Sequence, residues 1–311
     1  MKALKLCNDD SSSKVQTRNN KPLIPVTVIN KKIQYNAEGL ILVKSAGQRT
    51  VFDDLGDSTN TSECLAEEKI STFHDFDITR KQLDILLNDK WLDSHLINYF
   101  LYRIQQSFPK CKVLSSFFFT SLLNAFQGGF LTKVFENRSK EMDHLYIDQQ
   151  NHPFTAGTTI VIPINYPDQT HWILAVVSMT EKKIIIYNSS PGIIKEPPEF
   201  FGIPLLTFFV EEFNYRKEDD QIQNTEKFSV DGWTHMYGEC SRQADGINCG
   251  VYTILNMYKM MMIQESDNND VLGNCFTNKQ YTGEQMSDIR YSMVEICCLR
   301  EGVKLLEKHL W

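Results

Sequence analysis

Residues 171–188 read HWILAVVSMTEKKIIIYN. Two apolar, β-branched runs in this stretch flank a short polar segment, a pattern typical of an antiparallel hairpin. We centre the turn between Met179 and Thr180, and this register places His171 opposite Asn188. Side chains opposed in this way have Cβ atoms about 4.5–5.5 Å apart. The pairing predicts that Asn188 accepts a hydrogen bond from one ring nitrogen of His171, which fixes the tautomer of the imidazole.

Segments on both sides of this hairpin predict further strands and helices. Apolar residues three and four positions apart predict helices, and short β-branched runs predict strands. Thr79 and Gln82 have the spacing of a capping box ahead of Leu83, so one helix is expected to begin there. The other expected helices begin near Asp93 or span 199–215, 249–262 and 288–306, and the expected strands span 159–164, 172–177, 184–187 and 233–237. The pattern predicts an α+β domain with a central mixed sheet flanked by helices, in which the apolar stretch 117–123 fits either a strand or a helix.

The first 72 residues differ from the rest of the chain. Residues 8–20 are almost entirely polar, which is typical of a disordered segment. Two short β-branched runs, 26–29 and 40–43, predict a hairpin, and an acidic stretch over 53–69 predicts a linker. We therefore expect a partly disordered N-terminal extension over 1–72 and a single folded domain over 73–311.

Composition and charge disfavour several classes of protein. The 32 basic and 39 acidic residues give a formal net charge of −7, and no run of Lys and Arg is present to bind nucleic acid. No apolar stretch is long enough to span a membrane, and the N-terminus lacks the features of a signal peptide. The 8 cysteines form no CxxC pair, which indicates reduced thiols and no zinc site. We expect a monomer inside the cell, in nucleus or cytoplasm (of a host, for a secreted effector), with no metal, cofactor, nucleic acid or membrane partner.

Cys249 is the candidate nucleophile. It follows a turn-rich loop and begins a predicted amphipathic helix with one buried face. The positive end of a helix dipole and a neighbouring imidazole both favour a thiolate, so we expect a lowered thiol pKa and a thiolate–imidazolium pair with His171. Gly250 leaves room beside the thiol for a substrate carbonyl. Gln243, six residues before the cysteine, can offer its amide N–H to an oxyanion together with the backbone N–H of Cys249.

Each of these residues also has a structural interpretation. A buried cysteine is more often a small apolar side chain than a nucleophile, and a histidine before a strand is commonly a polar residue at a sheet edge. Asn188 can simply begin the Asn-Ser-Ser-Pro-Gly turn. From spacing alone, the catalytic interpretation of the Cys–His–Asn assembly and the structural interpretation of its residues both stay open.

Several motifs, in order along the chain, resemble those of the Ulp/SENP ubiquitin-like-protein-specific cysteine proteases. The matching stretches are Trp91-Leu92-Asp93 followed by Ile97-Asn98-Tyr99-Phe100, Phe117-Phe118-Phe119-Thr120, Ile162-Pro163-Ile164-Asn165 leading to His171-Trp172-Ile173-Leu174, Ile186-Tyr187-Asn188-Ser189, and Gln243-Ala-Asp-Gly-Ile-Asn-Cys249-Gly-Val-Tyr. The resemblance covers about residues 73–306. It implies a papain-like, Ulp-type fold.

The resemblance also implies roles for individual residues. Cys249 is the nucleophile, His171 the general base, Asn188 the orienting residue and Gln243 the oxyanion donor. The residues implied for substrate binding are Trp91, Trp172 and Asp93. The two tryptophans are expected to flank a narrow tunnel for a Gly-Gly tail, since only glycine lets a backbone pass between two indole faces.

The chain departs from the family pattern at position 188, where Asp is usual and Asn is present. A neutral amide orients the imidazole but stabilises its charged form less, so we expect a slower but active enzyme. The implied function is cleavage after the C-terminal Gly-Gly of a ubiquitin-like modifier. SUMO is the first expectation, and ubiquitin or a Nedd-type modifier is the alternative. An acyltransferase and a catalytically silent modifier-binding module are the other readings.

Overall fold

The computed structural model describes residues 66–73, 76–128, 157–166, 171–218, 228–265, 279–299 and 302–310, together with five short strands between residues 15 and 43. The chain divides into two compact units, which are described separately. The first unit comprises residues 1–90 and 284–305, and the second comprises residues 91–283 and 306–311. All of the candidate site residues belong to the second unit.

A five-stranded sheet organises the second unit. Its strands are β8 (Cys111–Val113), β9 (Thr159–Tyr166), β10 (His171–Ser178), β11 (Lys183–Tyr187) and β12 (Thr234–Gly238), in the spatial order β12-β11-β10-β9-β8. The three middle strands are antiparallel, whereas each edge strand runs parallel to its neighbour. The predicted strands and the predicted mixed sheet are therefore confirmed.

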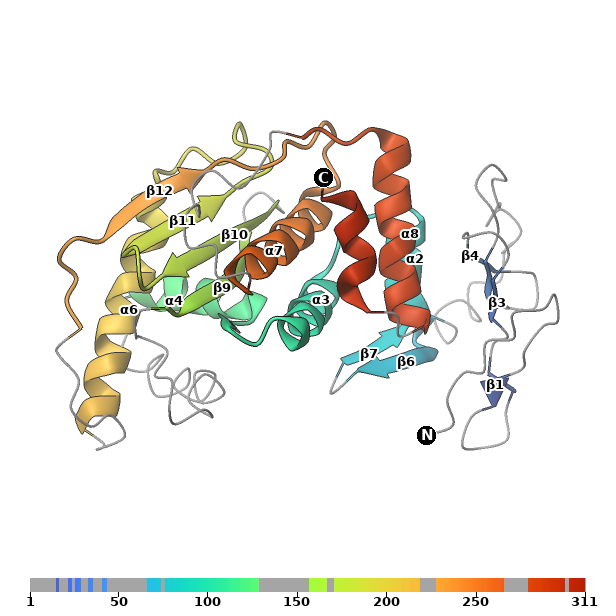
Figure 1. Ribbon diagram of the computed structural model, residues 1–311, viewed down its shortest axis with the longest axis horizontal. Helices are drawn as coiled ribbons and strands as arrows, with labels where there is room; N and C mark the ends of the chain where they lie inside the picture. Colours follow the sequence, from blue (N-terminus) through green and yellow to red (C-terminus); the bar gives the residue numbers. More distant parts are fainter. Residues whose placement is uncertain are drawn as a thin grey trace. The chain divides into compact units, whose positions relative to one another are not determined.

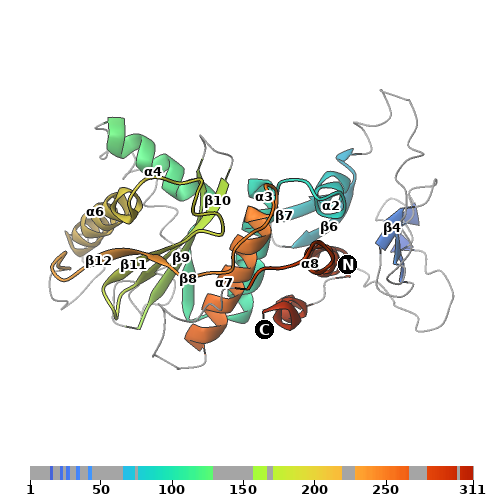
Figure 2. The ribbon, with the colours of Figure 1, turned by 90° about the horizontal axis from the view of Figure 1, so that it is seen from above.

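Helices cover both faces of this sheet (Figures 1 and 2). The helices α4 (Ser116–Gly128) and α6 (Pro198–Glu218) lie on one face, and α3 (Ser94–Ser107) and α7 (Cys249–Glu265) lie on the other. Alternate residues of β9, β10 and β11 form an apolar core with α4 and α6, because side chains along a strand point to opposite faces in turn. The stretch 117–123, which fitted either structure, is part of a helix.

The hairpin differs in register from the prediction. Ser178 pairs with Lys183, which centres the turn between Thr180 and Glu181, one residue later than expected. In this register Asn188 comes level with Ile173 rather than with His171. The side-chain period of a strand is two, so this shift leaves the residues at 171 and 188 on the same face, as diagonal neighbours.

Helix α7 differs from the predicted amphipathic helix. Every residue from Cys249 to Met261 is buried, including Thr253, Asn256 and Lys259. The helix packs on β10 and on α3, so more than one side is covered. A single buried face was therefore the wrong expectation, and the nucleophile candidate begins a central helix.

The first unit contains β6 (Lys69–Phe73), β7 (Phe76–Thr79), α2 (Arg80–Leu87) and α8 (Gly283–Leu299). The predicted capping box is confirmed, with the Thr79 backbone N–H donating to the Gln82 side chain over 3.1 Å. The buried Arg290 donates to the carbonyl oxygens of Ile85 and Lys90 and so satisfies the C-terminal end of α2. The expected helix 288–306 is wrong in extent, because α8 ends at Leu299 and a separate 3₁₀ helix spans Val303–His309.

The N-terminal region contains β1 (Val15–Gln16), β2 (Pro22–Leu23), β3 (Val26–Val28), β4 (Ile33–Tyr35) and β5 (Ile41–Val43). The hairpin predicted from 26–29 and 40–43 is wrong: β3 and β5 pair directly but in parallel. The antiparallel partner of β5 is β4, which the sequence reading left out. Apart from β1, the polar stretch 8–20 lies outside the described residues, as does most of the acidic stretch 53–69.

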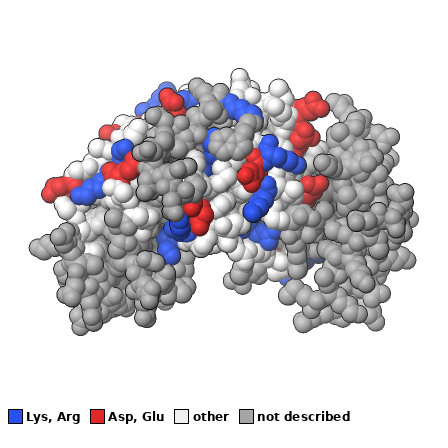
Figure 3. Space-filling view, viewed as in Figure 1, with Lys and Arg blue, Asp and Glu red and all other residues white. Residues whose placement is uncertain are grey.

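No helix among the described residues is long and apolar enough to cross a membrane. On the face drawn in Figure 3, the described Lys and Arg side chains are interspersed with Asp and Glu rather than gathered into one area.

Candidate active site

Cys249 is the first residue of α7 and follows a loop that is stabilised by hydrogen bonds among its own residues. The Asp245 carboxylate accepts hydrogen bonds from the backbone N–H groups of Ile247, over 2.9 Å, and of Asn248, over 2.8 Å. The Asn248 carbonyl then accepts the N–H of Tyr252 over 3.0 Å, which starts the helical hydrogen-bond ladder. The cysteine is thus fixed at a helix N-terminus, as the sequence predicted.

The start of β10 meets the start of α7 at this point. Backbone N–H groups of Trp172, of Gly250 and of Cys249 itself form hydrogen bonds that favour the thiolate form of Cys249. Because His171 is bonded to Trp172 in the chain, the contact brings histidine and cysteine to one place although 249 − 171 = 78 positions separate them. Both side chains are buried.

The predicted contact between His171 and Asn188 is present. His171 Nε2 lies 2.8 Å from Asn188 Oδ1, and the same oxygen accepts the backbone N–H of Ser190 over 2.9 Å. A backbone N–H can only donate, so the atom that faces Ser190 must be the amide oxygen. His171 Nε2 must then carry the proton, which leaves Nδ1 with a lone pair in the neutral ring. The imidazole is held as the tautomer that can accept a proton at Nδ1.

The pKa directions overturn the expected ion pair. Burial raises the pKa of the Cys249 thiol above its ordinary value, and the nearby Asp245 carboxylate acts in the same direction; the three backbone N–H groups oppose this only in part. Burial also lowers the pKa of His171, against the effect of the hydrogen bond that its ring donates to Asn188. Desolvation penalises the charged form of each group, so at neutral pH the free protein holds a thiol and a neutral imidazole.

These directions predict the pH dependence of the Asn188→Asp variant. In the wild type, kcat/KM rises with pH as His171 loses its proton, at a pH below the ordinary imidazole value of 6.5. A carboxylate beside the ring favours imidazolium and raises the pKa of His171. We therefore expect the acidic limb of the pH–rate profile to lie about 1 pH unit or more higher in the variant. At pH 8 the variant is faster, because the imidazolium formed during attack is stabilised.

The measurement is a pH–rate profile of both proteins, together with an NMR titration of the imidazole in the Cys249→Ala background. If the acidic limb of the profile lies at the same pH in Asn188→Asp as in the wild type, ionisation of His171 does not control the rate.

Gln243 is held at both ends of its amide. Its Oε1 accepts the Ser189 hydroxyl over 2.7 Å, and its Nε2 donates to the Asp245 carbonyl over 2.6 Å. Its backbone N–H donates to the Ser189 carbonyl over 3.0 Å. The predicted oxyanion donor is thereby fixed between the turn after β11 and the loop before α7.

The two tryptophans expected to bind substrate differ in exposure. Trp91 is 50% exposed and its indole N–H donates to the Gly246 carbonyl over 2.9 Å. Trp172 is 3% exposed and donates to the Leu92 carbonyl over 2.8 Å. Both indoles are thus anchored around the loop that carries Cys249, one at the surface and one in the interior.

The structure gives Asp93 a role that the sequence reading did not assign. Its carboxylate accepts the N–H of Leu96 over 2.9 Å, as the N-cap of α3. An N-cap of this kind satisfies one of the free donors at the helix start. The residue fixes the position at which α3 follows Trp91 and Leu92.

Comparison with known proteins identifies the fold and the family. Residues 87–293 match the Ulp1 protease family, C-terminal catalytic domain. The chain belongs to the Ulp1 protease family. That family consists of cysteine peptidases that act on ubiquitin-like proteins, in agreement with the resemblance of the motifs.

Two relatives of the Ulp1 family are each similar to more than half of this chain. Ubiquitin-like-specific protease 1A of Arabidopsis thaliana is 28% identical over 205 residues, which are 63% of this chain and 36% of that protein. Ubiquitin-like-specific protease 1 of Saccharomyces cerevisiae is 27% identical over 181 residues, 58% of this chain and 25% of that protein. The chain therefore matches well under half the length of these relatives.

Solved structures show the same fold. The Ulp1-like SUMO protease catalytic domain of Chaetomium thermophilum has a TM-score of 0.53 at 19% identity, covering 85% of this chain and 97% of that one. The C-terminal Ulp1 protease domain in complex with Smt3, the yeast ortholog of SUMO, has a TM-score of 0.51 at 17% identity, covering 77% and 92%.

Gly250 packs closely against Leu92, a contact that the sequence analysis did not predict. A Cβ atom at this position would lie 2.9 Å from Leu92 Cβ and 3.1 Å from Leu92 Cγ. The missing side chain makes room for Leu92, whose carbonyl accepts the Trp172 indole N–H. The glycine thus lets the helix that carries Cys249 approach the segment after Trp91.

We predict that Gly250→Ala lowers the free energy of unfolding by about 1–3 kcal/mol, the usual cost of overpacking a filled site. Gly246→Ala is the matched control, because no atom lies within 4 Å of a Cβ at that position. Urea denaturation of the three proteins measures the difference. Equal midpoints for Gly250→Ala and the wild type would contradict the close packing against Leu92.

Three positioning residues escaped the sequence reading. Ser189 and Leu92 were each quoted within a motif without a role, and Asp245 was treated as part of a turn. The role of Asp245 could have been predicted from the Asp-Gly-Ile-Asn stretch before Cys249, because an Asp side chain commonly accepts a hydrogen bond from the backbone two residues further on. The partners of Ser189 and Leu92 are distant in sequence, and nothing local indicates them.

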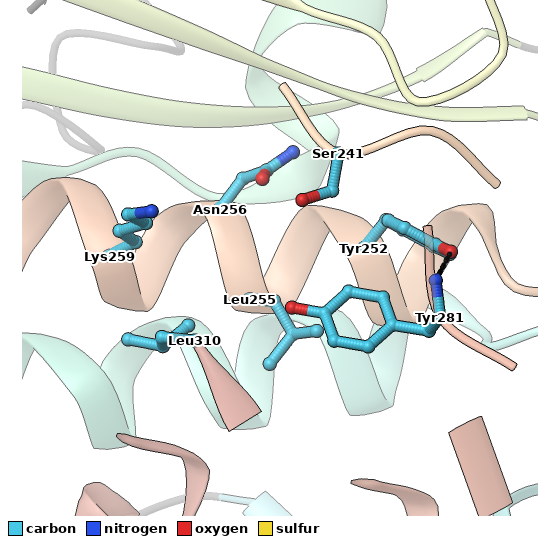
Figure 4. A pocket seen from close by; sticks show the side chains of 7 residues that line it. All are labelled: Ser241, Tyr252, Leu255, Asn256, Lys259, Tyr281 and Leu310. Carbon is cyan, nitrogen blue, oxygen red and sulfur yellow. Dashed lines mark hydrogen bonds between the residues drawn. The ribbon is translucent and has the colours of Figure 1, made fainter. Parts of the chain in front are cut away.

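Helix α7 also borders a small cavity away from the cysteine. It is lined by residues of α7 with Ser241, Tyr281 and Leu310, and the Tyr252 hydroxyl accepts the Tyr281 N–H over 3.4 Å there (Figure 4). Its volume of about 10 Å³ is enough for roughly one water molecule. Cys249 does not line it, so this cavity is separate from the site.

Proposed function

We propose that the protein is a thiol isopeptidase and endopeptidase that cleaves after the C-terminal Gly-Gly of a ubiquitin-like modifier, with SUMO as the first candidate. The observation that carries the proposal is the 2.8 Å contact of His171 Nε2 with Asn188 Oδ1, beside the buried thiol that begins α7. This contact leaves Nδ1 as the basic atom of the ring. A neutral base next to a neutral thiol is suited to proton transfer coupled to attack.

The proposed reaction begins with attack of Cys249 Sγ on the carbonyl carbon of the terminal glycine. His171 Nδ1 takes the thiol proton as the carbon–sulfur bond forms, and the Asn188 oxygen holds the imidazolium through Nε2–H. The carbonyl π electrons move to oxygen, and the oxyanion accepts hydrogen bonds from Gln243 Nε2 and the Cys249 backbone N–H.

The intermediate then collapses to a thioester. The bond from carbon to the leaving nitrogen breaks, and His171 returns its proton to that nitrogen, which departs as a neutral amine. Water, deprotonated by the same Nδ1 atom, attacks the thioester carbon, and the thiolate that leaves regains the proton. One peptide or isopeptide bond and one water are consumed, and an acid and an amine are released.

Trp91 and Trp172 are proposed to hold the Gly-Gly tail, and Asp93 to contribute to the same substrate-binding segment. Their placement around the Cys249 loop supports this, because Trp91 is anchored on Gly246 and Trp172 on Leu92. A side chain on the tail residues would have to pass the indole faces, which favours glycine.

SUMO is the first candidate because the similar structures include a SUMO protease and a protease bound to Smt3. The proposed catalytic domain covers residues 73–311, with 1–72 as an extension. We further propose that the protein acts as a monomer inside the cell, without nucleic acid.

The test is a panel of SUMO, ubiquitin and a Nedd-type modifier, each with an electrophilic C-terminal group. Each modifier is mixed with wild type and with Cys249→Ala, and adducts are read by gel shift. A SUMO adduct that requires Cys249 is the expected result. An adduct only with ubiquitin or the Nedd-type modifier would replace SUMO as substrate.

A folded wild type that forms no adduct would overturn the proposed cleavage. Retained binding of a modifier without turnover would then favour the silent module, and acetyl-CoA-dependent labelling of Cys249 would favour the acyltransferase.

A further inference from the structure

We infer that Ser189 is a positioning residue for Gln243, which it holds in the one amide orientation that offers an N–H to the oxyanion. The inference rests on the proposed function, in which Gln243 is the oxyanion donor. It assigns a role to a residue that neither touches substrate nor takes part in proton transfer. Ser189 follows Asn188, so a single turn after β11 would position both the base and the oxyanion donor.

The contacts of the Gln243 amide determine which end is oxygen. One end lies 2.6 Å from the Asp245 carbonyl oxygen, which can only accept, so this end must be Nε2. The other end is therefore Oε1, and the Ser189 hydroxyl, 2.7 Å away, must be the donor. The assignment follows from hydrogen-bond chemistry and leaves no second orientation that satisfies both contacts.

One amide hydrogen remains for the substrate. Nε2 carries two hydrogens, and among the described residues one of them is used by Asp245. The amide is planar, so fixing Oε1 on Ser189 and one N–H on Asp245 also fixes the direction of the second N–H. A donor held in advance in this way costs no reorganisation when negative charge develops on the substrate oxygen.

Burial makes the serine hydroxyl hard to replace. Ser189 is 2% exposed, so water has little access to take over its hydrogen bond. Without the hydroxyl, Oε1 loses its hydrogen-bond partner, and the contact of Nε2 with the Asp245 carbonyl alone holds the amide. An amide that moves about this single contact no longer holds its second N–H in one direction toward the developing oxyanion.

The backbone contact around Ser189 does not depend on its side chain. The Ser189 carbonyl accepts the Gln243 N–H over 3.0 Å, and the Arg242 guanidinium donates to the Asn188 carbonyl over 3.3 Å. Both bonds persist when the hydroxyl is removed. Ser189→Ala is thus a substitution that removes one hydrogen bond and leaves the turn anchored.

The test compares wild type, Ser189→Ala, Gln243→Ala and the double variant in single-turnover cleavage of a modifier conjugate. We expect Ser189→Ala to lower kcat about tenfold with little change in KM, as for one lost transition-state hydrogen bond. Gln243→Ala is expected to lower kcat about 10²-fold or more. In the Gln243→Ala background, removal of the Ser189 hydroxyl is expected to cause no further loss, because it acts through that amide.

Ser292→Ala is the matched control. Ser292 lies in the first unit and has the same 2% exposure, and its hydroxyl donates to the Asp288 carbonyl of its own helix over 3.0 Å. It is expected to keep the wild-type kcat. A loss shared by both serine variants would assign the effect to general destabilisation and overturn the positioning role.

A second readout does not require activity. The side-chain amide protons of Gln243, assigned by their absence in Gln243→Ala, are followed by NMR, and we expect their shifts and exchange rates to change in Ser189→Ala. Unchanged resonances, full kcat in Ser189→Ala, or additive losses in the double variant would each overturn the inference. A wild type without activity toward any modifier, with the amide response present, would overturn the proposed function and leave the contact between Ser189 and Gln243 established.

Discussion

Replacing Cys249 with alanine abolishes cleavage, with an expected loss on the order of 10⁴-fold or more in kcat. The sulfur is the only protein atom in the proposed mechanism that bonds to the substrate carbon, so nothing in the remaining site can form the thioester. Burial raises the pKa of this thiol, and we therefore expect the wild-type protein to react slowly with small alkylating agents yet rapidly with a modifier bearing an electrophile. Single-turnover cleavage of a modifier conjugate measures the loss.

Cys240→Ala is the matched control for this prediction. Cys240 is also buried and unpaired, and burial raises its pKa to about 11. Cys240 lies outside the loop that precedes α7. Its substitution should leave kcat within about twofold of the wild-type value, because the activation free energy of cleavage is unchanged. Cleavage that survives in Cys249→Ala and disappears in Cys240→Ala would show that Cys240, and not Cys249, is the nucleophile.

His171→Ala has the second largest expected effect, a loss of about 10³-fold to 10⁴-fold in kcat at pH 7. Because burial holds Cys249 as a thiol, the helix N-terminus alone does not supply a thiolate. The remaining activity of the variant should rise steadily with pH, since only ionisation of the thiol by solvent can then generate the nucleophile. A pH–rate profile up to pH 10 checks both the size of the loss and the slope.

His235→Ala serves as the control histidine. Burial lowers the pKa of His235 as it lowers that of His171, and no described residue forms a hydrogen bond with its Nε2. The ring packs directly on Gly202 of α6, away from Cys249. Wild-type activity is expected for this variant, and a small, pH-independent loss in His171→Ala would contradict the role of His171 as base.

The contact between His171 and Asn188 was predictable because side chains along a strand alternate between the two faces of the sheet. The register of the hairpin was displaced, yet His171 and Asn188 still meet, since a shift that preserves the face keeps diagonal neighbours within reach. The start of α7 was equally predictable, because a turn-rich loop followed by apolar residues at helical spacing marks a helix N-terminus.

The remaining features depend on contacts between distant segments. The thiol pKa is set mainly by burial, which no local pattern around Cys249 reveals, and the local dipole argument gave the wrong direction. The reason for Gly250 depends on Leu92, which is 250 − 92 = 158 positions away in the sequence. Full burial of α7 likewise follows from the elements that cover it rather than from its own sequence.

The central claim is that Cys249 Sγ attacks the terminal carbonyl of a modifier. Tandem mass spectrometry of the protein after reaction with a SUMO C-terminal electrophile tests it most directly, because the digest locates the covalent remnant on a single residue. We expect the remnant on Cys249, and we expect the adduct to form much more slowly in His171→Ala. A remnant on Cys240 or another residue, or equal rates in the two proteins, would contradict it.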